Sequence, residues 1–409
     1  MLLTKYVNSC KVAIIGLGYV GLPLLCQFSK RFDCLGLDVD RRRVEELSMG
    51  EDRKHCVPIE YIKSTHSDCF TTNWDHISDC KYFIVTAPTP ISSDRKPDIT
   101  SLKNISENLG RIIKPGAIII FESTVSPGTT EDVCVTIIER VSGLKLNQDF
   151  YVGYSPERIN IGDSVHTLGN VPKIISASNS ASLEAIKTLY KEGLGCEIVK
   201  ASSIRVAEAA KLYENVQRDV LIALANQYSD YCQTEGIDIN EVTKCASTKW
   251  NFEEVYPGMV GGHCIGVDPY YLLERAERIN VEMPLVKVAR SINEGVAHKI
   301  ATKILTYVQK SKNPSVLILG ASYKANTGDV RNSKVFDVAD ELTKVSCNVR
   351  IYDPLVAHQN IPERYTDFFI NSADLLFKWD VVAELVPHSA FGDIKIPDAT
   401  CRISLGDLV

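Results

Sequence analysis

Residues 11 to 21 read Lys-Val-Ala-Ile-Ile-Gly-Leu-Gly-Tyr-Val-Gly, and they are the most informative residues for the fold of the N-terminal part of the chain. A short, β-favouring apolar run leads into a glycine turn, and an apolar segment continues through Phe28. A second run, residues 34 to 37, ends in Asp38. A strand, a G-x-G-x-x-G turn, a helix, a strand and an acid in this order predict a dinucleotide-binding βαβ unit.

The same residues predict which dinucleotide binds. The glycines allow a tight turn in which a pyrophosphate approaches the N-terminus of the following helix. Asp38 is expected to bind the ribose hydroxyls and to repel a 2′-phosphate, which favours NAD over NADP. The arginines at 41 to 43 weaken this preference, because an arginine can accommodate the phosphate.

The pattern of strand and helix then repeats. Apolar runs at residues 82 to 86 and 117 to 121, with helical segments between them, extend a parallel, doubly wound sheet. Ligands of such sheets lie at the carboxyl ends of the strands. The hydroxyl residues expected there beside the cofactor are Thr86, Thr89, Ser123 and Thr124. Helix capping is the alternative role for these hydroxyls. A run at 151 to 154 opens into a loop that offers an acid and a base, Glu157 and Arg158.

A long helical pattern covers residues 203 to 236. Its length exceeds that of a usual globular helix, so it predicts a spine between domains or a dimerisation element. Glu208, Lys211 and Asn215 stand on one face of this helix within an apolar stretch. Lys211 either extends its ammonium to solvent or stabilises an oxyanion and lowers the pKa of a nearby thiol.

An irregular loop rich in glycine and proline follows at residues 256 to 272. Two consecutive glycines in it let the backbone approach a ligand where a side chain would clash. Cys264 follows this opening, with His263 beside it and Asp268 four residues later. Those are the parts of an activated nucleophile. The alternative is that Cys264 is one of thirteen cysteines that fill space as small hydrophobes.

A second βαβ-like half begins after a helical region at about 284 to 310. It has strands at residues 315 to 320 and 348 to 352, and it lacks G-x-G-x-x-G. We therefore expect it to bind something other than a dinucleotide. Lys324 and Arg331 suit the phosphates of a mononucleotide, and surface charges without a ligand are the alternative.

The composition sets outer limits on function. A chain of 409 residues with a net charge of −6 fits two or three domains and has no general attraction to nucleic acid or anionic membranes. No stretch is long enough for a bilayer span, and the N-terminus lacks a signal-peptide layout. The odd number of cysteines, with no Cys-x-x-Cys, favours a reducing compartment over a disulfide framework or a zinc site. We expect a cytoplasmic protein without a metal.

Six motifs in order resemble the nucleotide-sugar 6-dehydrogenases, a family that includes UDP-glucose, GDP-mannose and UDP-N-acetylhexosamine enzymes. The motifs cover nearly the whole chain, at residues 16–23, 123–130, 155–159, 210–215, 261–269 and 324–333. Residues 250–252 and 257–272 look most like the UDP-N-acetylglucosamine and UDP-N-acetylgalactosamine enzymes of bacterial capsule, Vi-antigen and O-antigen pathways.

The resemblance implies an α/β protein with two Rossmann-like, doubly wound parallel-sheet domains joined by a long central helix. We expect an NAD-binding domain over residues 1–200 and a UDP-sugar-binding domain over 312–409. Residues 201–311 would form a central helical domain with the dimerisation helix and the nucleophile loop. A homodimer is the expected assembly.

The resemblance also implies the roles of individual residues. The positions matching catalytic residues are Cys264 as nucleophile, Lys211 and Asn215 for developing negative charge, Asp268 near the thiol, and Glu157 and Thr124 for water activation and proton handling. The expected NAD contacts are Gly16, Gly18, Tyr19, Val20, Gly21, Asp38, Arg43, Thr86, Thr89, Ser123, Thr124 and Arg331. The expected substrate contacts are Glu157, Arg158, Lys211, Asn215, Tyr256, Gly261, Gly262, His263 and Lys324.

Two positions depart from the family pattern: the first changes a turn, and the second bears on the substrate. Ile161 stands where relatives commonly carry proline, and Thr327-Gly328-Asp329 is closer to the UDP-glucose branch. UDP-glucose, UDP-N-acetylmannosamine and GDP-mannose therefore stay open as substrates. A two-electron 3-hydroxyacid-type dehydrogenase and a non-catalytic nucleotide-sugar sensor also stay open as functions. A sensor has no need of a thiol, and a count of NADH per substrate separates two-electron from four-electron oxidation.

Overall fold

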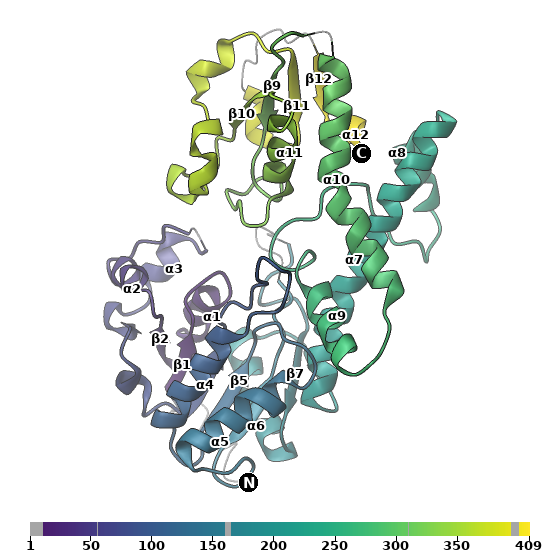
Figure 1. Cartoon of the computed structure of the whole chain (residues 1–409). Coiled ribbons are helices and arrows are strands. Elements are labelled where there is room, and N and C mark those ends of the chain that lie inside the picture. The colour runs from purple at the N-terminus through teal and green to yellow at the C-terminus, as the bar shows by residue number, and fades with distance from the viewer. Residues whose placement is uncertain (1–10, 55, 160–164, 310, 394–400) are drawn as a thin grey trace. The chain divides into compact units, whose positions relative to one another are not determined.

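The computed structural model describes residues 11–54, 56–159, 165–309, 311–393 and 401–409 (Figure 1). Ile161, where the sequence departs from its relatives, lies outside this part of the chain. The chain divides into two compact units. Unit 1 contains the residues up to Tyr213 together with Tyr270–Arg275, and unit 2 contains Glu214–Pro269 and Ala276–Val409.

Unit 1 is built on an eight-stranded sheet with the order β3-β2-β1-β4-β5-β6-β7-β8. Its strands are β1 Lys11–Ile15, β2 Asp33–Leu37, β3 Phe70–Thr71, β4 Tyr82–Val85, β5 Ile118–Phe121, β6 Tyr151–Tyr154, β7 Lys173–Ala177 and β8 Ile198–Lys200. Neighbouring strands are parallel except for β6 and β7, which are antiparallel. The chain order reverses between β1 and β4, which is where ligands of doubly wound sheets bind.

Helices bury both faces of this sheet. Their bounds are α1 Gly21–Phe28, α2 Arg41–Ser48, α3 Ile59–Lys63, α4 Thr100–Ile112, α5 Thr136–Ser142 and α6 Ser180–Leu194. Val12 and Ile14 of β1 pack into one core with α1 and α6, whereas Ala13 and Ile15 pack into another with α4 and α5. Burial on both faces explains why the strands are continuous apolar runs in the sequence.

Unit 2 contains a four-stranded, fully parallel sheet with the order β10-β9-β11-β12. Its strands are β9 Ser315–Leu319, β10 Asn348–Tyr352, β11 Val381–Glu384 and β12 Cys401–Ser404. The helices described in the rest of the chain are α7 Ile204–Glu235, α8 Ile239–Ala246, α9 Asp268–Arg278, α10 Pro284–Val308, α11 Lys334–Thr343 and α12 Leu405–Leu408.

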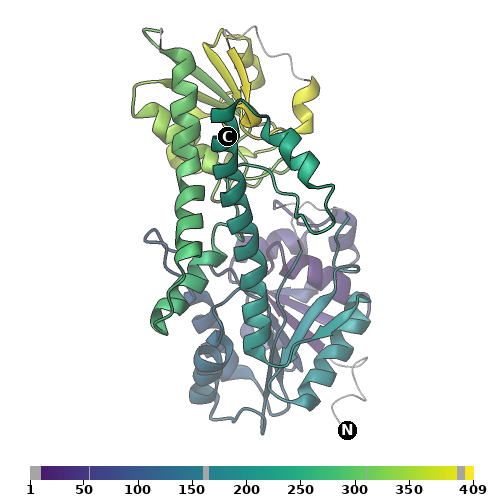
Figure 2. The same ribbon diagram turned by 90° about the vertical axis from the view of Figure 1, so that its right-hand side faces the viewer.

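The two long helices α7 and α10 lie side by side (Figure 2), and buried polar groups join them within unit 2. Asp219 of α7 accepts hydrogen bonds from Arg290 at 2.5 Å and from Asn293 at 2.8 Å, both on α10. Asn226 bonds to Asn293 at 3.0 Å further along α7. Because buried polar groups need partners, these bonds fix the register of the two helices.

The expected fold class is confirmed, since both units contain doubly wound, largely parallel sheets. The long helix expected at 203–236 is α7, and the helical region expected at about 284–310 is α10. Strands β3, β7, β8, β11 and β12 were not predicted from the sequence, because these short runs stand apart from the motifs and polar loops that marked the other strands. Among the described helices, none combines the length and the apolar character needed to cross a membrane.

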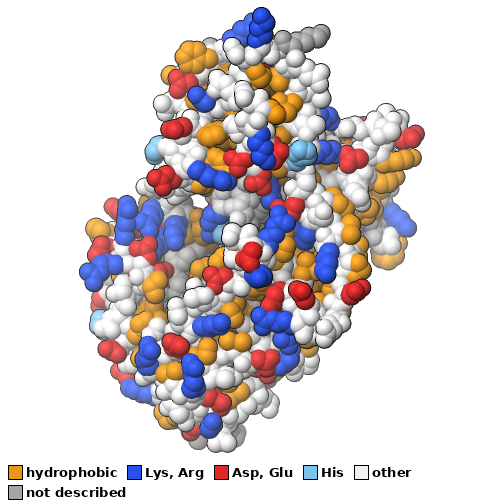
Figure 3. Space-filling model, viewed as in Figure 1, with side chains coloured by type: hydrophobic (Ala, Val, Ile, Leu, Met, Phe, Trp, Pro, Cys, Tyr) orange, Lys and Arg blue, Asp and Glu red, His pale blue; other side chains and the backbone are white. Residues whose placement is uncertain are grey.

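Basic side chains gather on one surface of unit 1, over α2 and α3 (Figure 3). They are interleaved with acids: Arg53 lies 2.7 Å from Asp40 and 3.2 Å from Glu46. Arg43, the third residue of the basic run, is fully buried. The positive charge of this surface is therefore largely paired within the protein.

Candidate active site

Each glycine of the first turn in unit 1 has a distinct steric role. Gly16 has φ +96°, a left-handed conformation that favours glycine. A Cβ on Gly21 would lie 1.8 Å from the Gly16 carbonyl oxygen, so this glycine lets α1 pack closely on the turn. A Cβ on Gly18 would meet no atom within 4 Å, which leaves that backbone open. A tight turn, an open backbone and close packing are the three roles of this motif when it binds pyrophosphate, so the turn fits NAD.

Asp38 and Arg43 brace this turn from β2 and α2. A carboxylate oxygen of Asp38 accepts the Leu17 amide at 2.8 Å. Arg43 Nε donates to the Leu17 carbonyl at 3.0 Å, and Nη1 contacts Asp52 Oδ1 at 2.6 Å. Asp38 is half-buried, with its other carboxylate oxygen on the Asp40 amide. Contact of either side chain with NAD remains a prediction.

The hydroxyl groups predicted beside the cofactor join the loops at the carboxyl ends of the strands. Thr86 Oγ1 donates to the Gly16 carbonyl, Thr89 Oγ1 to the Thr124 carbonyl and Ser123 Oγ to the Ala87 carbonyl, each at 2.7 Å. These bonds run between loops, which is not the geometry of a helix cap. They hold the loops after β1, β4 and β5 together at the switch point of the sheet.

Glu208 holds a further loop of unit 1, a role that the sequence analysis missed. Its carboxylate accepts the amides of Gly128 at 2.6 Å and Thr130 at 3.0 Å. Burial raises the pKa of Glu208 to about 7 although these bonds act in the opposite direction. Lys211, one turn further along α7, is buried, which disfavours the interpretation that its ammonium simply extends into solvent.

Glu157 follows β6, and backbone amides and a cation hold it. One carboxylate oxygen accepts the amides of Arg158 and Ile159, each at 2.7 Å. The other lies 3.2 Å from the Lys173 ammonium. Burial alone would raise the pKa of Glu157, but Lys173 and the two amides outweigh it and hold the pKa below its usual value. Glu157 is therefore an ionised carboxylate at neutral pH.

In unit 2, the structure brings together three of the predicted catalytic residues. The carbonyl of Cys264 accepts the amides of Val267 at 3.1 Å and Asp268 at 2.9 Å, so the loop turns tightly into α9. Asp268 is buried at the start of that helix. Asn215 Nδ2 of α7 donates to its carboxylate at 2.5 Å. The remaining predicted catalytic residues, Lys211, Glu157 and Thr124, belong to unit 1.

The exposure of Cys264 distinguishes it from most cysteines in the described part of the chain. Burial raises the pKa of Cys26, Cys34 and Cys134 to about 12, so these thiols stay protonated and unreactive. Cys264 is exposed, as is Cys245. This contrast favours a nucleophile over a space-filling side chain.

The glycines before Cys264 pack against another loop of unit 2. A Cβ on Gly261 would lie 2.8 Å from the Asn332 carbonyl oxygen, and one on Gly262 would lie 2.8 Å from the Tyr323 ring. Asn332 Nδ2 also donates to the Gly262 carbonyl at 3.1 Å. The sequence predicted that the backbone at these two glycines approaches a ligand closely. In this structure, that backbone closely approaches Asn332 and Tyr323 of the protein itself. Contact with substrate remains a prediction.

His263 is held neutral beside the thiol. Burial, followed by the positive charge of Arg331, lowers its pKa to about 4. Arg331 itself pairs with Asp329, its Nε lying 2.8 Å from a carboxylate oxygen. An imidazolium is therefore not the group that activates Cys264 at neutral pH.

The other predicted substrate residues lie in separate places. Lys324 is half-buried on the loop after β9. Tyr256 is exposed, and its hydroxyl donates to Glu254 at 2.7 Å. Arg158 Nη1 in unit 1 donates to the Pro172 carbonyl at 2.9 Å.

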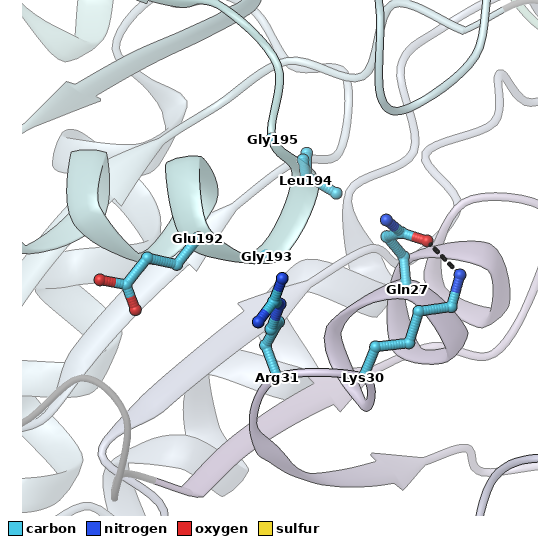
Figure 4. A pocket seen from close by; sticks show the side chains of 7 residues that line it. All are labelled: Gln27, Lys30, Arg31, Glu192, Gly193, Leu194 and Gly195. Atoms are coloured by element: carbon cyan, nitrogen blue, oxygen red, sulfur yellow. Dashed lines mark hydrogen bonds between the residues drawn. The ribbon is translucent and has the colours of Figure 1, made fainter.

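A surface pocket of about 360 Å³ in unit 1 is distinct from the glycine turn (Figure 4). Its lining residues are Gln27, Lys30, Arg31, Glu192, Gly193, Leu194 and Gly195. They stand at the C-terminal ends of α1 and α6, whereas the turn lies at the N-terminus of α1. Lys30 and Arg31 there complement the partial negative charge of the helix ends. We assign this pocket no part in cofactor binding.

A Rossmann unit with a dinucleotide turn, in a chain that also carries an exposed thiol beside a buried acid, defines a nicotinamide-dependent dehydrogenase. Sequence comparison agrees. The chain matches three domains of the UDP-glucose/GDP-mannose dehydrogenase family: the NAD binding domain over residues 10–193, the central domain over 205–295 and the UDP binding domain over 317–404.

Similar individual proteins carry related names. UDP-N-acetyl-D-glucosamine 6-dehydrogenase of Salmonella typhi is 42% identical over 396 residues, covering 96% of this chain and 93% of its own. The Pseudomonas aeruginosa enzyme of the same name is 42% identical over 359 residues, covering 87% and 85%. The solved UDP-D-ManNAc dehydrogenase of Pyrococcus horikoshii superposes with a TM-score of 0.86 at 26% identity, covering 97% and 99%.

The chain therefore belongs to the UDP-glucose/GDP-mannose dehydrogenase family. It is an NAD-dependent nucleotide-sugar dehydrogenase, as the sequence motifs predicted.

Proposed function

We propose that the chain oxidises C6 of UDP-N-acetylglucosamine, and of UDP-N-acetylgalactosamine as a second substrate, to the uronic acid. The observation that carries this proposal is the exposed Cys264 beside the buried Asp268, which the half-buried Asn215 contacts. The two relatives that are 42% identical and act on UDP-N-acetyl-D-glucosamine support the choice of sugar.

Oxidation of a primary alcohol to a carboxylate removes four electrons. NAD supplies the hydride acceptor, one molecule for each of two successive oxidations. The Cys264 sulfur bonds to the carbon of the intermediate aldehyde, giving a thiohemiacetal that stays on the enzyme. Loss of the second hydride converts it to a thioester. Water then forms the new C–O bond, the C–S bond breaks, and the carboxylate leaves.

The other predicted catalytic groups move protons and stabilise charge in this scheme. Lys211 and Asn215 stabilise the oxyanions that form at C6. Asp268 handles the proton of the thiol, and Thr124 and Glu157 handle the protons of the alcohol and the hydrolytic water. Asn215 and Asp268 are already bonded to each other, which orients both groups.

Charged groups of unit 2 hold the UDP moiety in this proposal. Lys324 binds the nucleotide sugar. Arg331 is paired with Asp329, and its expected contact with NAD stays a prediction. Because the protein is acidic as a whole, placed cations of this kind account for binding of an anionic diphosphate.

We also propose that the chain is a homodimer formed through α7. Leu224, Tyr228 and Tyr231 are exposed at i, i+4 and i+7, so they form one apolar stripe on this helix. The rings of Tyr228 and Tyr231 lie 5.5 Å apart. The same stripe on a second copy would cover it. Sedimentation of Tyr228→Glu as a monomer, against a dimer for the parent protein, tests this.

The cysteines of the described residues form no disulfides, which suits a reducing cytoplasm. We assign the enzyme to that compartment and to surface polysaccharide biosynthesis.

Cys264→Ser tests the covalent step, with Cys245→Ser as the matched control because both thiols are exposed. We expect Cys264→Ser to lose formation of the uronic acid by at least about a thousandfold while NAD binding persists. Cys245→Ser should keep full turnover. Near-normal NADH production by Cys264→Ser would defeat the proposal.

A further inference from the structure

Four titratable side chains meet at one edge of the sheet in unit 1. The Lys173 ammonium lies 3.0 Å from Glu122 Oε2 and 3.2 Å from Glu157 Oε2. The Tyr190 hydroxyl donates to the other carboxylate oxygen of Glu122. The proposed reaction uses Glu157, and it gives the other three side chains no role.

The antiparallel strand β7 explains why these groups meet. Glu122 follows β5, and Glu157 follows β6, both at the carboxyl end of their strands. Because β7 runs in the opposite direction, its first residue, Lys173, comes to the same edge. The register pairs Tyr154 with Ser176, and its continuation by three residues places Glu157 opposite Lys173. A fully parallel sheet would put the start of β7 at the other edge.

The exposure of the side chains increases across the cluster from Glu122 through Lys173 to Glu157. The side chain of Glu122 is 0% exposed, that of Lys173 is 5% exposed, and that of Glu157 is 15% exposed. Buried charges are costly unless they are paired, so Lys173 and Glu122 stabilise each other in the interior. Glu157 is the member of the cluster that water can reach.

The charges act on Glu157 in a defined direction. The Lys173 ammonium and two backbone amides lower the pKa of Glu157 against the effect of burial. Burial raises the pKa of Glu122, and it raises that of Tyr190, which is neutral. Burial also raises the pKa of the neighbouring Cys196 thiol. Among these groups, Lys173 is the cation that favours the ionised form of Glu157.

Arg158, the other cation next to Glu157 in sequence, directs Nη1 to the Pro172 carbonyl. Its backbone amide is the part that bonds the Glu157 carboxylate. Ionisation of Glu157 therefore depends on Lys173 together with two amides of its own loop.

We propose that Lys173 is a positioning residue for the hydrolytic half of the reaction, fixing Glu157 as an ionised base for the water that attacks the thioester on Cys264. This inference rests on the proposed function. The water oxygen bonds to the acyl carbon, one water proton passes to the Glu157 carboxylate, and the C–S bond breaks with release of the Cys264 thiolate. The acid product then ionises in solvent. Glu122 shares the ammonium and moderates its effect.

Two neutral, nearly isosteric variants should shift the hydrolysis step in opposite directions. Lys173→Met removes the cation, so the pH below which the thioester decays slowly should rise by roughly one to three units. The thioester should accumulate below this raised limit and decay normally above it. Glu122→Gln leaves the whole ammonium to Glu157, so the same pH limit should fall or stay in place. The measurement is the mass of the Cys264 peptide after acid quenching of a single turnover, across a pH range that begins below the ordinary Glu pKa of 4.5 and extends into the alkaline range.

Two further variants guard against misfolding. Lys173→Met with Glu122→Gln removes one charge of each sign, and it should give the raised pH limit in a folded protein. Lys173→Arg keeps the cation and should restore decay toward the parent rate. Unchanged decay in both Lys173→Met variants would overturn the inference, and so would a shift in the same direction for Lys173→Met and Glu122→Gln.

The parent enzyme separates failure of this inference from failure of the proposed function. If the parent forms no adduct on Cys264 and yields one NADH per sugar, the proposed function is wrong. If the parent forms the adduct and the variants decay as it does, the function stands and the role of Lys173 is wrong.

Discussion

The first strand of each unit leads into a glycine turn of the same geometry, but the two turns form different sites. In unit 1, Gly16 follows β1 with φ +96°, and its amide donates to the Leu37 carbonyl at 2.8 Å. In unit 2, Gly320 follows β9 with φ +86°, and its amide donates to the Tyr352 carbonyl at 2.9 Å. An acid ends the next strand in each unit and accepts an amide of the turn, Asp38 at 2.8 Å and Asp353 at 2.7 Å.

The difference lies in what surrounds the acid and the turn. Asp38 is half-buried, and the turn beside it is open at Gly18. Asp353 is buried and bonded to His388 Nε2 at 3.0 Å. The Nδ1 atom of His388 accepts the Asn326 amide at 2.8 Å, so the bonding assigns the imidazole proton to Nε2.

The second turn has polar groups where the first has open glycine backbone. Ser322 is fully buried, and its hydroxyl donates to the Lys324 carbonyl at 2.8 Å. In unit 2, the carboxylate of the acid and the polar groups of the turn thus bond to other groups of the protein. The side chain that the loop offers to a ligand is Lys324. In both units the strand topology supplies a place for a ligand, whereas a few turn residues determine which ligand binds.

The largest expected effect comes from the packing glycine of unit 1. Gly21→Ala should lower the free energy of unfolding by about 3 kcal/mol or more and abolish NAD binding, because the new Cβ meets the Gly16 carbonyl at 1.8 Å. Gly18→Ala has open space, so its stability should change by less than about 1 kcal/mol while NAD affinity falls at least about tenfold. Urea unfolding and NAD titration measure both, and equal loss of stability in the two variants would contradict the distinction.

Replacement of Asp353 and replacement of Asp38 should have different effects on stability and on NAD binding. Asp353→Ala leaves His388 and buried amides without an acceptor, so it should cost about 2 to 4 kcal/mol of stability and leave the intrinsic NAD affinity unchanged. Asp38→Ala should cost about 1 kcal/mol and lower NAD affinity by about tenfold or more. Urea unfolding and NAD titration again measure the change in stability and the change in NAD affinity. A stability loss in Asp38→Ala as large as that in Asp353→Ala would erase the difference between the two turns.

A smaller effect is expected from a change at Lys324, and it should distinguish UDP binding by unit 2 from NAD binding by unit 1. Lys324→Met should weaken binding of UDP by roughly tenfold, since it removes one charge-assisted hydrogen bond to phosphate. NAD affinity should stay the same. Calorimetric titration with UDP and with NAD measures both, and Lys312→Met, at a lysine outside the turn, serves as control. A loss confined to NAD would assign Lys324 to the other ligand.

The smallest effect concerns acid stability. Burial would raise the pKa of Asp353, but His388 and the turn amides outweigh it and lower the pKa below the ordinary 3.8. The stabilisation from this group is therefore complete above pH 3.8 and is lost as pH falls through its lower folded value. Asp353→Asn should flatten the decline of unfolding free energy below about pH 4. An unchanged slope between about pH 4 and pH 2 would show that Asp353 does not titrate in this way.

The sequence was most informative where a motif and a period coincide. Residues 11 to 15 and the glycines after them predicted β1 and its turn to the residue, and the loop around Cys264 predicted the thiol and its buried acid. The partners of Glu157 and Asp353 could not be predicted. Lys173 lies on the antiparallel strand β7 and His388 follows β11, and no motif in the sequence marks either strand or its pairing.

The proposed reaction is a four-electron oxidation that one chain carries out through Cys264. The most direct test is a spectrophotometric count of NADH formed from a limiting amount of UDP-N-acetylglucosamine, beside UDP-N-acetylgalactosamine, UDP-glucose, UDP-N-acetylmannosamine and GDP-mannose. We predict two NADH per UDP-N-acetylglucosamine or UDP-N-acetylgalactosamine, with little turnover of the other three sugars. One NADH per sugar would contradict the covalent second oxidation, and two NADH from UDP-glucose alone would keep the mechanism and contradict the choice of substrate.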